Sequence, residues 1–394
     1  MIPNTSVPSR RPLRRRNNVW SASRPKGSSS IDGRELDWVL LGAGAAICAL
    51  GLVMVYSSTR RLVSSDPYYF VKRQGFALAI GVLVVAAMIR IDYRKWRDFS
   101  LLAYLGTCAL LFLVVTPLGS AVKGHQAWYQ LPGGFQLQPS EIAKFGLIIA
   151  LCGYVNEYRD ALDPWRITVL VGLALVPLAL VQLQPDLGTN MVLVVIVIGL
   201  LTVAGVRGRY LLVLALVGLT AVYAVVGLGL LKQYQIDRFT SVVDSGSGIA
   251  SGVSYNQDQS KTTIGSGGLL GAGLFNGSQT RLGFVPEQHT DFIFTAVGEE
   301  LGFVGAASLL ALFGIVMWRT WRAACTAGDV YGRLVCAAVL CFLAFEVFEN
   351  VGMTMGIMPV AGIPLPFVSY GGSSLLASCA CVGLVASVHV RRFK

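Results

Sequence analysis

The stretch "WVLLGAGAAICALGLVMVYS", residues 38–57, carries no charged residue over its whole length. A helix of about 20 residues crosses a hydrocarbon core roughly 30 Å thick. Similar runs recur along the chain, whose residues are 54% hydrophobic and only 13% charged, against about 25% charged in soluble proteins. The sequence therefore predicts an all-α polytopic membrane protein with about ten transmembrane helices, at residues 37–57, 74–91, 98–117, 140–155, 165–183, 187–205, 208–231, 291–318, 330–356 and 370–390.

Basic residues concentrate at one end of the chain and on one side of the predicted helices. Eight of the 32 Lys and Arg residues lie in residues 1–36, a segment with too few apolar residues to fold. Counted on alternate sides of the membrane, 22 of the 32 lie on the side of the N-terminus, so the positive-inside bias places both termini in the cytoplasm. We expect residues 1–36 to form a disordered basic cytoplasmic tail and residues 37–394 to form one transmembrane domain.

The net charge and the cysteines exclude two other classes of protein. A net charge of +11 would suggest nucleic acid in a soluble protein. Here the tail is typical of contact with anionic membrane lipid, with binding of a protein partner as the alternative. Seven of the eight cysteines lie inside apolar runs, where a free cysteine acts as a small hydrophobe. We therefore expect no nucleic-acid partner, no disulfide framework and no metal site.

One long loop, residues 232–290, follows the seventh predicted helix and lies on the extracytoplasmic side in this orientation. It is rich in Gly and poor in charge, yet it holds several Leu and Phe residues. Loops of this length are usually functional or disordered. The apolar residues favour an ordered loop with short helical pieces that lie against the membrane surface.

Ionisable side chains gather at one mouth of the predicted bundle. Because charge at a membrane span is costly, such residues mark function by default. Arg73 precedes the second span, Glu141 and Lys144 open the fourth, Asp186 follows the fifth and Asp291 opens the eighth. With the N-terminus inside, all five face the extracytoplasmic side. Glu141 and Lys144 share a helix face, either as a mutually neutralising pair or with Glu141 orienting Lys144 toward an anionic group.

The two aspartates each have two interpretations. Asp186 follows Pro185 at the start of a helix, where it serves either as an N-cap or in catalysis. Asp291 could likewise cap the eighth helix, in competition with Thr290. Its neighbours, which include His289 and a long polar loop, favour a carboxylate that acts as a general base.

The segment "PVAGIPLPFVSYGGSS", residues 359–374, cannot form a regular helix because it holds three prolines and Gly362. Non-helical backbone at membrane depth is tolerated only when it is buried in protein or lines a cavity. Ser369, Gly371 and Gly372 then open the last span, and we expect free N–H groups at this helix start to suit a phosphate.

Five motifs resemble, in order and spacing, those of the SEDS family (shape, elongation, division and sporulation). They cover nearly the whole chain from Trp38 onward: "QPSEIAK" at 138–144, "QPDLGT" at 184–189, "PEQHTDFIF" at 286–294, "GEELG" at 298–302 and "GIPLPFVSYGGSS" at 362–374. Within the family, "SKTTIGSGGLLGAG" at 260–273 is more similar to RodA, the elongation enzyme, than to FtsW, the division protein. FtsW usually carries "FGRGG" where this chain has "IGSGG" at 264–268.

The resemblance implies a peptidoglycan glycosyltransferase of the bacterial plasma membrane that polymerises lipid II, in a complex with a class B penicillin-binding protein. Asp291 matches the family's essential aspartate, and Arg73, Glu141 and Lys144 match its other charged positions. We expect Asp291 to be the base and Lys144 and Arg73 to stabilise the pyrophosphate, with or without a divalent cation, Mg²⁺ or Mn²⁺, while Glu141 and His289 position these groups.

Two other classes fit a polytopic bundle with a charged mouth. One is a flippase of lipid-linked precursors, which would also need polar groups across the membrane midplane. The other is a non-enzymatic scaffold of the cell-wall synthesis complex, for which the basic tail would be the signal.

Overall fold

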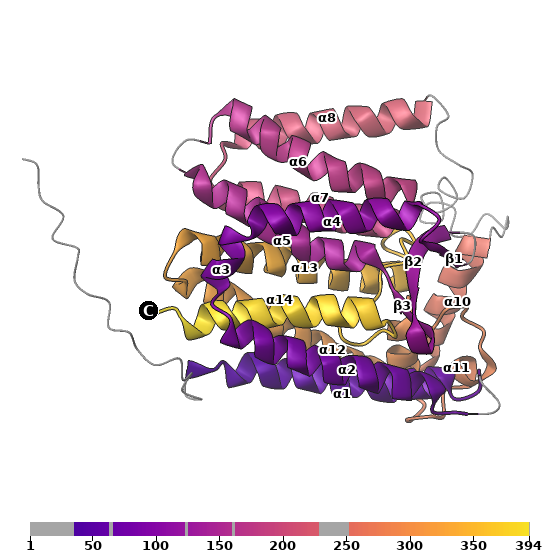
Figure 1. Cartoon of the computed structure of the whole chain (residues 1–394). Coiled ribbons are helices and arrows are strands. Elements are labelled where there is room, and N and C mark those ends of the chain that lie inside the picture. The colour runs from indigo at the N-terminus through magenta and orange to yellow at the C-terminus, as the bar shows by residue number, and fades with distance from the viewer. Residues whose placement is uncertain (1–34, 63–65, 123–124, 160–161, 228–251, 394) are drawn as a thin grey trace, which may run out of the picture.

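The computed structural model describes residues 35–62, 66–122, 125–159, 162–227 and 252–393. Within these ranges, every predicted apolar run is a helix, and the helices lie side by side in one bundle (Figure 1). Their bounds are α1 (Trp38–Thr59), α2 (Tyr69–Arg90), α4 (Ser100–Val115), α5 (Pro139–Glu157), α6 (Pro164–Leu183), α7 (Leu187–Val203), α8 (Gly208–Gly227), α12 (Ile293–Thr326), α13 (Val330–Met355) and α14 (Gly372–Val390). The predicted tail lies outside the described residues, apart from its last two positions.

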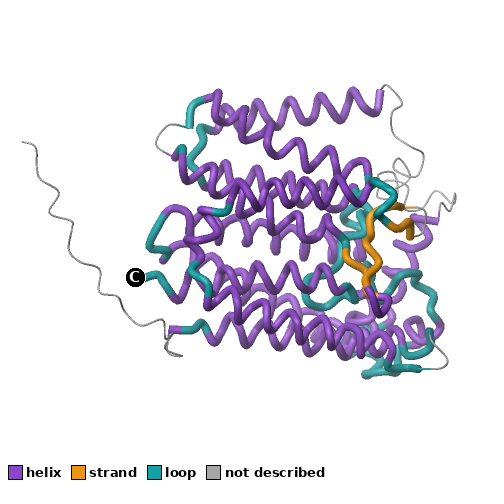
Figure 2. The backbone as a smooth tube through the Cα atoms, in the orientation of Figure 1, coloured by secondary structure: helices purple, strands orange, loops and turns teal. Residues whose placement is uncertain are grey.

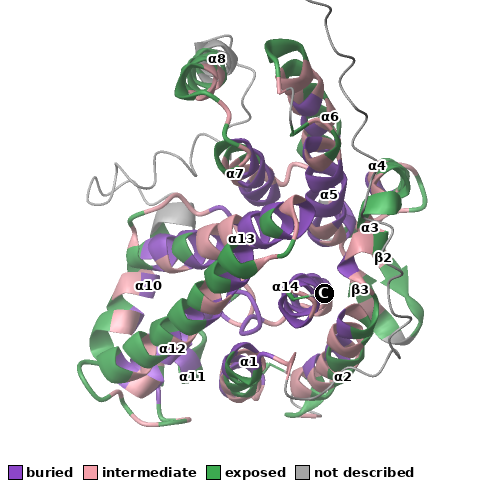
Figure 3. Ribbon diagram, turned by 90° about the vertical axis from the view of Figure 1, so that its left-hand side faces the viewer, coloured by how far each residue is buried: buried purple, intermediate pink, exposed green. Residues whose placement is uncertain are grey.

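Six of these helices, α1, α2, α6, α12, α13 and α14, are long and apolar enough to cross a membrane. α14 is almost wholly buried and packs against α2, α5, α12 and α13 in the middle of the bundle (Figure 3). In contrast, at most 22% of the apolar windows of α2, α6 and α12 is buried inside the bundle. An exposed apolar belt around a buried central helix is the pattern of a polytopic membrane protein, whereas the number of spans and their orientation stay predictions.

Aspartate side chains cap five of the described helices. Asp37, Asp163, Asp186 and Asp329 each accept a hydrogen bond from the backbone N–H three residues ahead, and Asp92 accepts from the N–H two residues ahead. Such N-caps satisfy a donor that the first helical turn leaves unpaired, at about 1 kcal/mol each. Asp186 is one of the candidate site residues, so its capping interpretation is confirmed.

Asp37 also holds the end of the bundle opposite the strands. Its carboxylate accepts from Nε of Arg319 on α12 at 2.8 Å, and Arg319 Nη2 lies 2.7 Å away. The Asp37 side chain is 1% exposed and that of Arg319 is 13% exposed. This ion pair therefore joins α1 to α12 in a nearly dry environment.

A small β-sheet departs from the all-α prediction. Strands β1 (Ser120–Val122), β2 (His125–Leu131) and β3 (Phe135–Leu137) pair antiparallel in the order β1-β2-β3 between α4 and α5. They lie at the end of the bundle that also holds α10 (Gly252–Ser266) and α11 (Ser278–Leu282) (Figure 2). The sheet satisfies the backbone groups of a connection too long for a tight turn. A short helix, α3 (Tyr93–Asp98), and a 3-10 turn, η2 (Pro132–Gly134), complete the described elements.

α12 is interrupted at Gly302, which adopts φ 67° and ψ −165°. At this break, the carbonyls of Glu299 and Glu300 accept from Ala272 and Gly273 at 2.9 and 3.0 Å. The N–H groups of Phe303 and Val304 donate to the carbonyls of Gly268 and Leu269 at 2.9 and 3.1 Å. The long loop therefore replaces the missing helical hydrogen bonds, and the prediction of one unbroken helix at 291–318 is wrong.

The described part of the long loop is ordered and contains the two short helices α10 and α11, as predicted. Carboxylates of α12 hold it in place. Glu299 accepts from the N–H groups of Gln279 and Thr280 at 2.7 and 2.8 Å, and Glu300 accepts from the N–H of Phe275 at 3.0 Å. Both glutamates of the "GEELG" motif are 1% exposed, so their role is to fasten the loop.

Candidate active site

Asp291 lies in a turn directly before α12 and is half-buried. The N-cap position of α12 is Phe292, and no side chain forms a cap hydrogen bond there. The hydroxyl of Thr290 instead donates to the carbonyl of Glu287 at 3.1 Å. The N-cap position thus falls one residue after Asp291 and two after Thr290, which does not favour the capping interpretation of Asp291. Another reason is needed for a carboxylate at this position.

Asn350 on α13 positions the backbone of Asp291. Its Nδ2 donates to the carbonyl of Asp291 at 2.7 Å and to the carbonyl of Ile363 at 2.7 Å, and the side chain is fully buried. The Asp291 carboxylate faces the same segment, since a Cβ built on Gly362, whose φ is +72°, would lie 3.4 Å from Oδ2. Sequence reasoning missed Asn350, although an amide inside the apolar run 330–356 was a usable signal.

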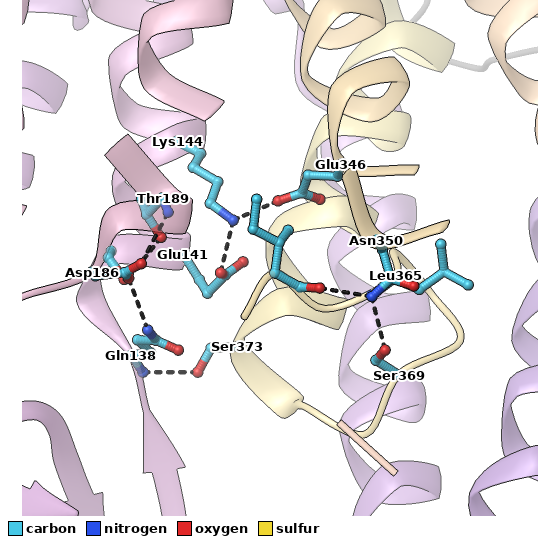
Figure 4. Close-up of polar contacts among 12 residues, drawn as sticks. Gln138, Glu141, Lys144, Asp186, Thr189, Glu346, Asn350, Leu365, Ser369 and Ser373 are labelled. Carbon is cyan, nitrogen blue, oxygen red and sulfur yellow. Dashed lines mark hydrogen bonds and ion pairs between the residues drawn. The ribbon is translucent and has the colours of Figure 1, made fainter. Parts of the chain in front are cut away.

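The non-helical segment before α14 is held by Gln74 on α2. Its Nε2 donates to the carbonyl of Ser369 at 3.0 Å, and its Oε1 accepts from the N–H of Gly371 at 3.2 Å. The hydroxyl oxygen of Ser369 accepts from the N–H of Leu365 at 2.8 Å (Figure 4). The N–H of Gly371 is therefore engaged within the protein, contrary to the expectation of a free donor, while Gly372 is the first residue of α14.

His289 lies against the same segment. Its carbonyl accepts from the N–H of Tyr370 at 2.8 Å, and its ring packs 5.2 Å from that of Phe70 and 5.7 Å from that of Tyr370, measured between centroids. The turn that carries Asp291 is thus joined to α2 and to the start of α14, as the prediction of a positioning role for His289 requires.

Arg73 completes this group from α2. Its guanidinium carbon lies 4.7 Å from the ring centroid of Tyr69 and 5.4 Å from that of Phe135 on β3. Arg73 also forms a side-chain hydrogen bond with Tyr370. A Cβ on Gly134 would lie 2.2 Å from Arg73 Nη2. Glycine is favoured in the turn after β2 because Gly134 has φ +73°, and a Cβ there would also push the end of the Arg73 side chain aside.

Lys144 belongs to a separate buried cluster. Its Nζ contacts Glu141 Oε1 at 2.7 Å and Glu346 Oε1 at 2.5 Å (Figure 4). Lys144 is 1% exposed, Glu141 3% and Glu346 0%. Lys144 therefore faces anionic groups, but these belong to the protein, and its ammonium is closed to a ligand in this structure. Glu346 was not among the predicted site residues.

Asp186 joins the start of α7 to the start of α5. Besides capping α7, its Oδ2 accepts from the hydroxyls of Thr189 and Ser140 at 2.7 and 3.0 Å and from Gln138 Nε2 at 3.3 Å (Figure 4). The same Gln138 donates its N–H to Ser373 on α14 at 2.9 Å. With its oxygens so engaged, Asp186 fixes three helix starts at the mouth and is not offered to a reacting group.

α13 connects the two groups. Glu346, which holds Lys144, and Asn350, which holds Asp291, are four residues apart and lie on one face of this helix. The structure thus brings Asp291, His289, Arg73, Ser369 and Gly371 together around the non-helical segment. Glu141, Lys144 and Asp186 brace the helices behind it.

The described residues offer little to a metal ion. Within them, no group of three or more His, Cys, Asp and Glu side chains is placed to hold one. Asp291 supplies one carboxylate, and Mg²⁺ commonly takes one or two carboxylates together with substrate phosphate oxygens. The side chains present fit a cation that is shared with a pyrophosphate rather than one caged by the protein.

Residues 37–394 match the sequence profile of the "Cell cycle protein" family that comprises FtsW, RodA and SpoVE. The chain belongs to this family. It is the SEDS family to which the motifs pointed, and that prediction is confirmed.

Named relatives of this SEDS chain carry enzyme names. The "Probable peptidoglycan glycosyltransferase FtsW" of Geobacter sulfurreducens is 34% identical over 90% of this chain and 95% of the relative. The "Peptidoglycan glycosyltransferase MrdB" of Escherichia coli K12 is 34% identical over 93% of this chain and 97% of the relative. The SEDS chain is therefore equally similar to these two relatives.

Solved structures agree with the fold. A chain from "Structural coordination of polymerization and crosslinking by a peptidoglycan synthase complex" matches with a TM-score of 0.77 and 33% identity, over 91% of this chain and 99% of that chain. The rod shape determining protein RodA of Thermus thermophilus matches with a TM-score of 0.68 and 32% identity, over 91% and 98%. The SEDS fold thus extends over nine-tenths of the chain.

Proposed function

We propose that this SEDS protein is a peptidoglycan glycosyltransferase that polymerises lipid II in the bacterial plasma membrane. The observation that carries the proposal is the half-buried Asp291, whose backbone carbonyl is held by Asn350 and whose carboxylate faces the non-helical segment, in a chain whose relatives bear that enzyme name. Membership of the family and the exposed apolar helices make it a multi-pass membrane protein.

The reaction joins the 4-hydroxyl of an acceptor sugar to the anomeric carbon of a donor sugar. As the new C–O bond forms, the bond from the anomeric carbon to the pyrophosphate oxygen breaks and the electron pair leaves with the polyprenyl pyrophosphate. Asp291 Oδ takes the hydroxyl proton as general base. A carboxylate suits this role because proton removal strengthens the nucleophile as the bond forms.

The leaving pyrophosphate needs positive charge. We assign this role to Arg73, which is half-buried beside Tyr370 at the same segment. Lys144 has a structural role instead. Its ammonium is paired with Glu141 and Glu346 and holds α5 against α13. A divalent cation, if bound, would be held by the Asp291 carboxylate and would supply further positive charge for the leaving group.

Asp291→Asn tests the assignment. The carboxamide keeps the shape of the side chain but cannot accept the proton. We expect loss of glycan polymerisation, measured with purified protein and labelled lipid II, while unfolding temperature and membrane insertion stay unchanged. An Asn variant that polymerised lipid II at the normal rate would remove the assigned base.

The partner and the cellular role belong to the same proposal. A class B penicillin-binding protein as partner is supported by the match to a chain of a peptidoglycan synthase complex. A role in elongation, as for RodA, is supported by "IGSGG" at 264–268, whereas overall identity does not separate the division relatives from the others. Expression of this chain in bacterial strains depleted of RodA or of FtsW tests the role. Rescue of elongation is expected, and rescue of septation alone would contradict it.

Most of the polar groups that a flippase would need along a crossing path are engaged in contacts within the protein. Four acids inside the predicted helices could line a crossing path: Glu299, Glu300, Glu346 and Glu349. Glu299 and Glu300 fasten the long loop and Glu346 pairs with Lys144, which leaves Glu349. A headgroup crossing the midplane would have to break these contacts. This arrangement favours the enzyme over the transporter.

A further inference from the structure

A pocket separate from the candidate active site lies beside the end of α1, at the end of the bundle that also holds α11. Its volume is about 460 Å³, and it shares no lining residue with the group around Asp291. Three arginines line it: Arg60 and Arg61 directly after α1, and Arg281 on α11. Tyr56 and Phe275 form its aromatic wall. No Asp or Glu of the described residues lines this pocket, so its electrostatic character is strongly positive.

Arg60 is fixed in advance of any ligand. Its Nη2 donates to the carbonyl of Phe275 at 2.5 Å, and its guanidinium carbon lies 5.5 Å from the centroid of the Phe275 ring. Its Nε is buried without a hydrogen-bond partner among the described residues. The Nη1 edge is then the part of this guanidinium left for a ligand. A planar donor edge that is already oriented suits a phosphate oxygen, because little side-chain freedom is lost on binding.

The acids around the pocket are already engaged. Asp66 pairs with Lys72 at 2.8 Å. Glu300 accepts from the N–H of Phe275 at 3.0 Å and from the hydroxyl of Ser57. Glu300 also interacts electrostatically with Arg60, but it is buried and does not line the pocket. Among the described residues the pocket wall therefore carries three arginines and no carboxylate, which favours a bound anion.

The position of the pocket indicates a ligand with an apolar part. Arg60 directly follows α1, one of the helices long enough to cross the membrane, so the arginines lie where lipid headgroups begin. Leu62 and Leu282, the neighbours of Arg61 and Arg281, are 56% and 65% exposed. Basic groups beside exposed leucines at a helix end match a phosphate carried on a hydrocarbon chain.

We propose that this pocket binds the phosphate group of a lipid in the membrane leaflet next to it. The phosphate belongs either to a phospholipid headgroup or to a polyprenyl pyrophosphate. Tyr56 of the pocket stacks on Tyr68, directly before α2, at 5.2 Å, and Phe70 in the first turn of α2 lies 5.2 Å from His289. The pocket and the candidate site therefore both adjoin the start of α2.

The test measures lipid binding by the full-length protein, purified in detergent. Native mass spectrometry would count phosphatidylglycerol retained by the wild type, by Arg60→Gln and by the double variant Arg61→Gln/Arg281→Gln. Arg61 and Arg281 are exposed, so the double variant leaves the packing intact. We expect each arginine removed to weaken retention about tenfold. Lys261→Gln, which removes one positive charge on α10 at the same end outside the pocket, should retain lipid like the wild type.

Competition identifies the source of the phosphate. Farnesyl pyrophosphate that displaces phosphatidylglycerol in an arginine-dependent manner assigns the pocket to lipid pyrophosphates. Failure to displace it assigns the pocket to phospholipid. Equal phosphatidylglycerol retention by all variants overturns the proposal. Because Asp291→Asn leaves this binding intact, the test is independent of the proposed catalytic function.

Discussion

Lys144 allows the sharpest test of how the site is built. Replacing it with Met removes the cation that faces Glu141 Oε1 at 2.7 Å and Glu346 Oε1 at 2.5 Å. Both carboxylates are almost fully buried, and their Oε2 atoms have no hydrogen-bond partner among the described residues. The variant therefore leaves two acids facing each other without a counter-charge in a dry interior.

The size of the effect follows from this burial. Breaking a buried ion pair by removing one partner costs about 3–5 kcal/mol, because an uncompensated charge stays behind. Replacing a whole buried charged group with well-packed hydrophobic residues of similar volume is often neutral or stabilising by about 1–4 kcal/mol. We therefore expect Lys144→Met to lower the free energy of unfolding by about 3–5 kcal/mol. The triple variant with Glu141→Met and Glu346→Met should recover most of that loss.

The assay is unfolding of the purified protein in detergent, combined with lipid II polymerisation by each variant that folds. A structural role for Lys144 predicts a stable triple variant that keeps activity. A triple variant that is stable but inactive would instead return Lys144 to direct contact with the pyrophosphate. A single variant as stable as the wild type would refute the reasoning about buried charge.

Three further substitutions test the contacts that hold the mouth and the bundle. Asn350→Leu frees the backbone of Asp291, and since misplacement of a catalytic group by about 1 Å can cost about 100-fold in rate, we expect a loss of that order in lipid II polymerisation; wild-type activity would contradict the clamp. Gly302→Ala places a Cβ 2.3 Å from the nitrogen of Gly271 and should destabilise by at least about 3 kcal/mol, whereas Gly314→Ala, with open space around it, should not lower the unfolding temperature. Arg319→Gln strands the buried Asp37 and should cost about 3–5 kcal/mol, with exposed Arg322→Gln as the control that leaves stability unchanged.

Local patterns in the sequence predicted the helices because apolar length and breakers are local properties. The apolar runs became helices within a few residues of the expected bounds, and Asp186 caps its helix as its place after Pro185 indicated. The prediction failed where distant segments exchange hydrogen bonds. The break at Gly302 exists because residues 268–273 supply partners to α12, and no pattern within 291–318 contains that information.

For the candidate site, topology correctly gathered the charged residues at one end of the bundle, since alternate helix ends must meet there. It could not separate their roles. Asp291 and Lys144 both appear in the sequence as charges at helix starts. In the structure, Asp291 is half-buried and tied by Asn350 to the segment before α14, whereas Lys144 is enclosed between Glu141 and Glu346. The side-chain amides of Gln74 and Asn350 were not predicted as site residues because the sequence of an apolar run does not show which distant group an amide will hydrogen-bond.

The sequence by itself determined that the chain is a helical membrane protein of the SEDS family with its charges at one mouth, because hydropathy and motif order are properties of the chain alone. Only the tertiary structure decided that Lys144 is paired with carboxylates of the protein and that Asp291 lies beside the non-helical segment. A buried charge is stable only next to its counter-charge, and α13 brings Glu346 to Lys144 across about 200 positions of sequence. The packing of α13 therefore decides that Lys144 has a structural role while Asp291 remains beside the candidate site.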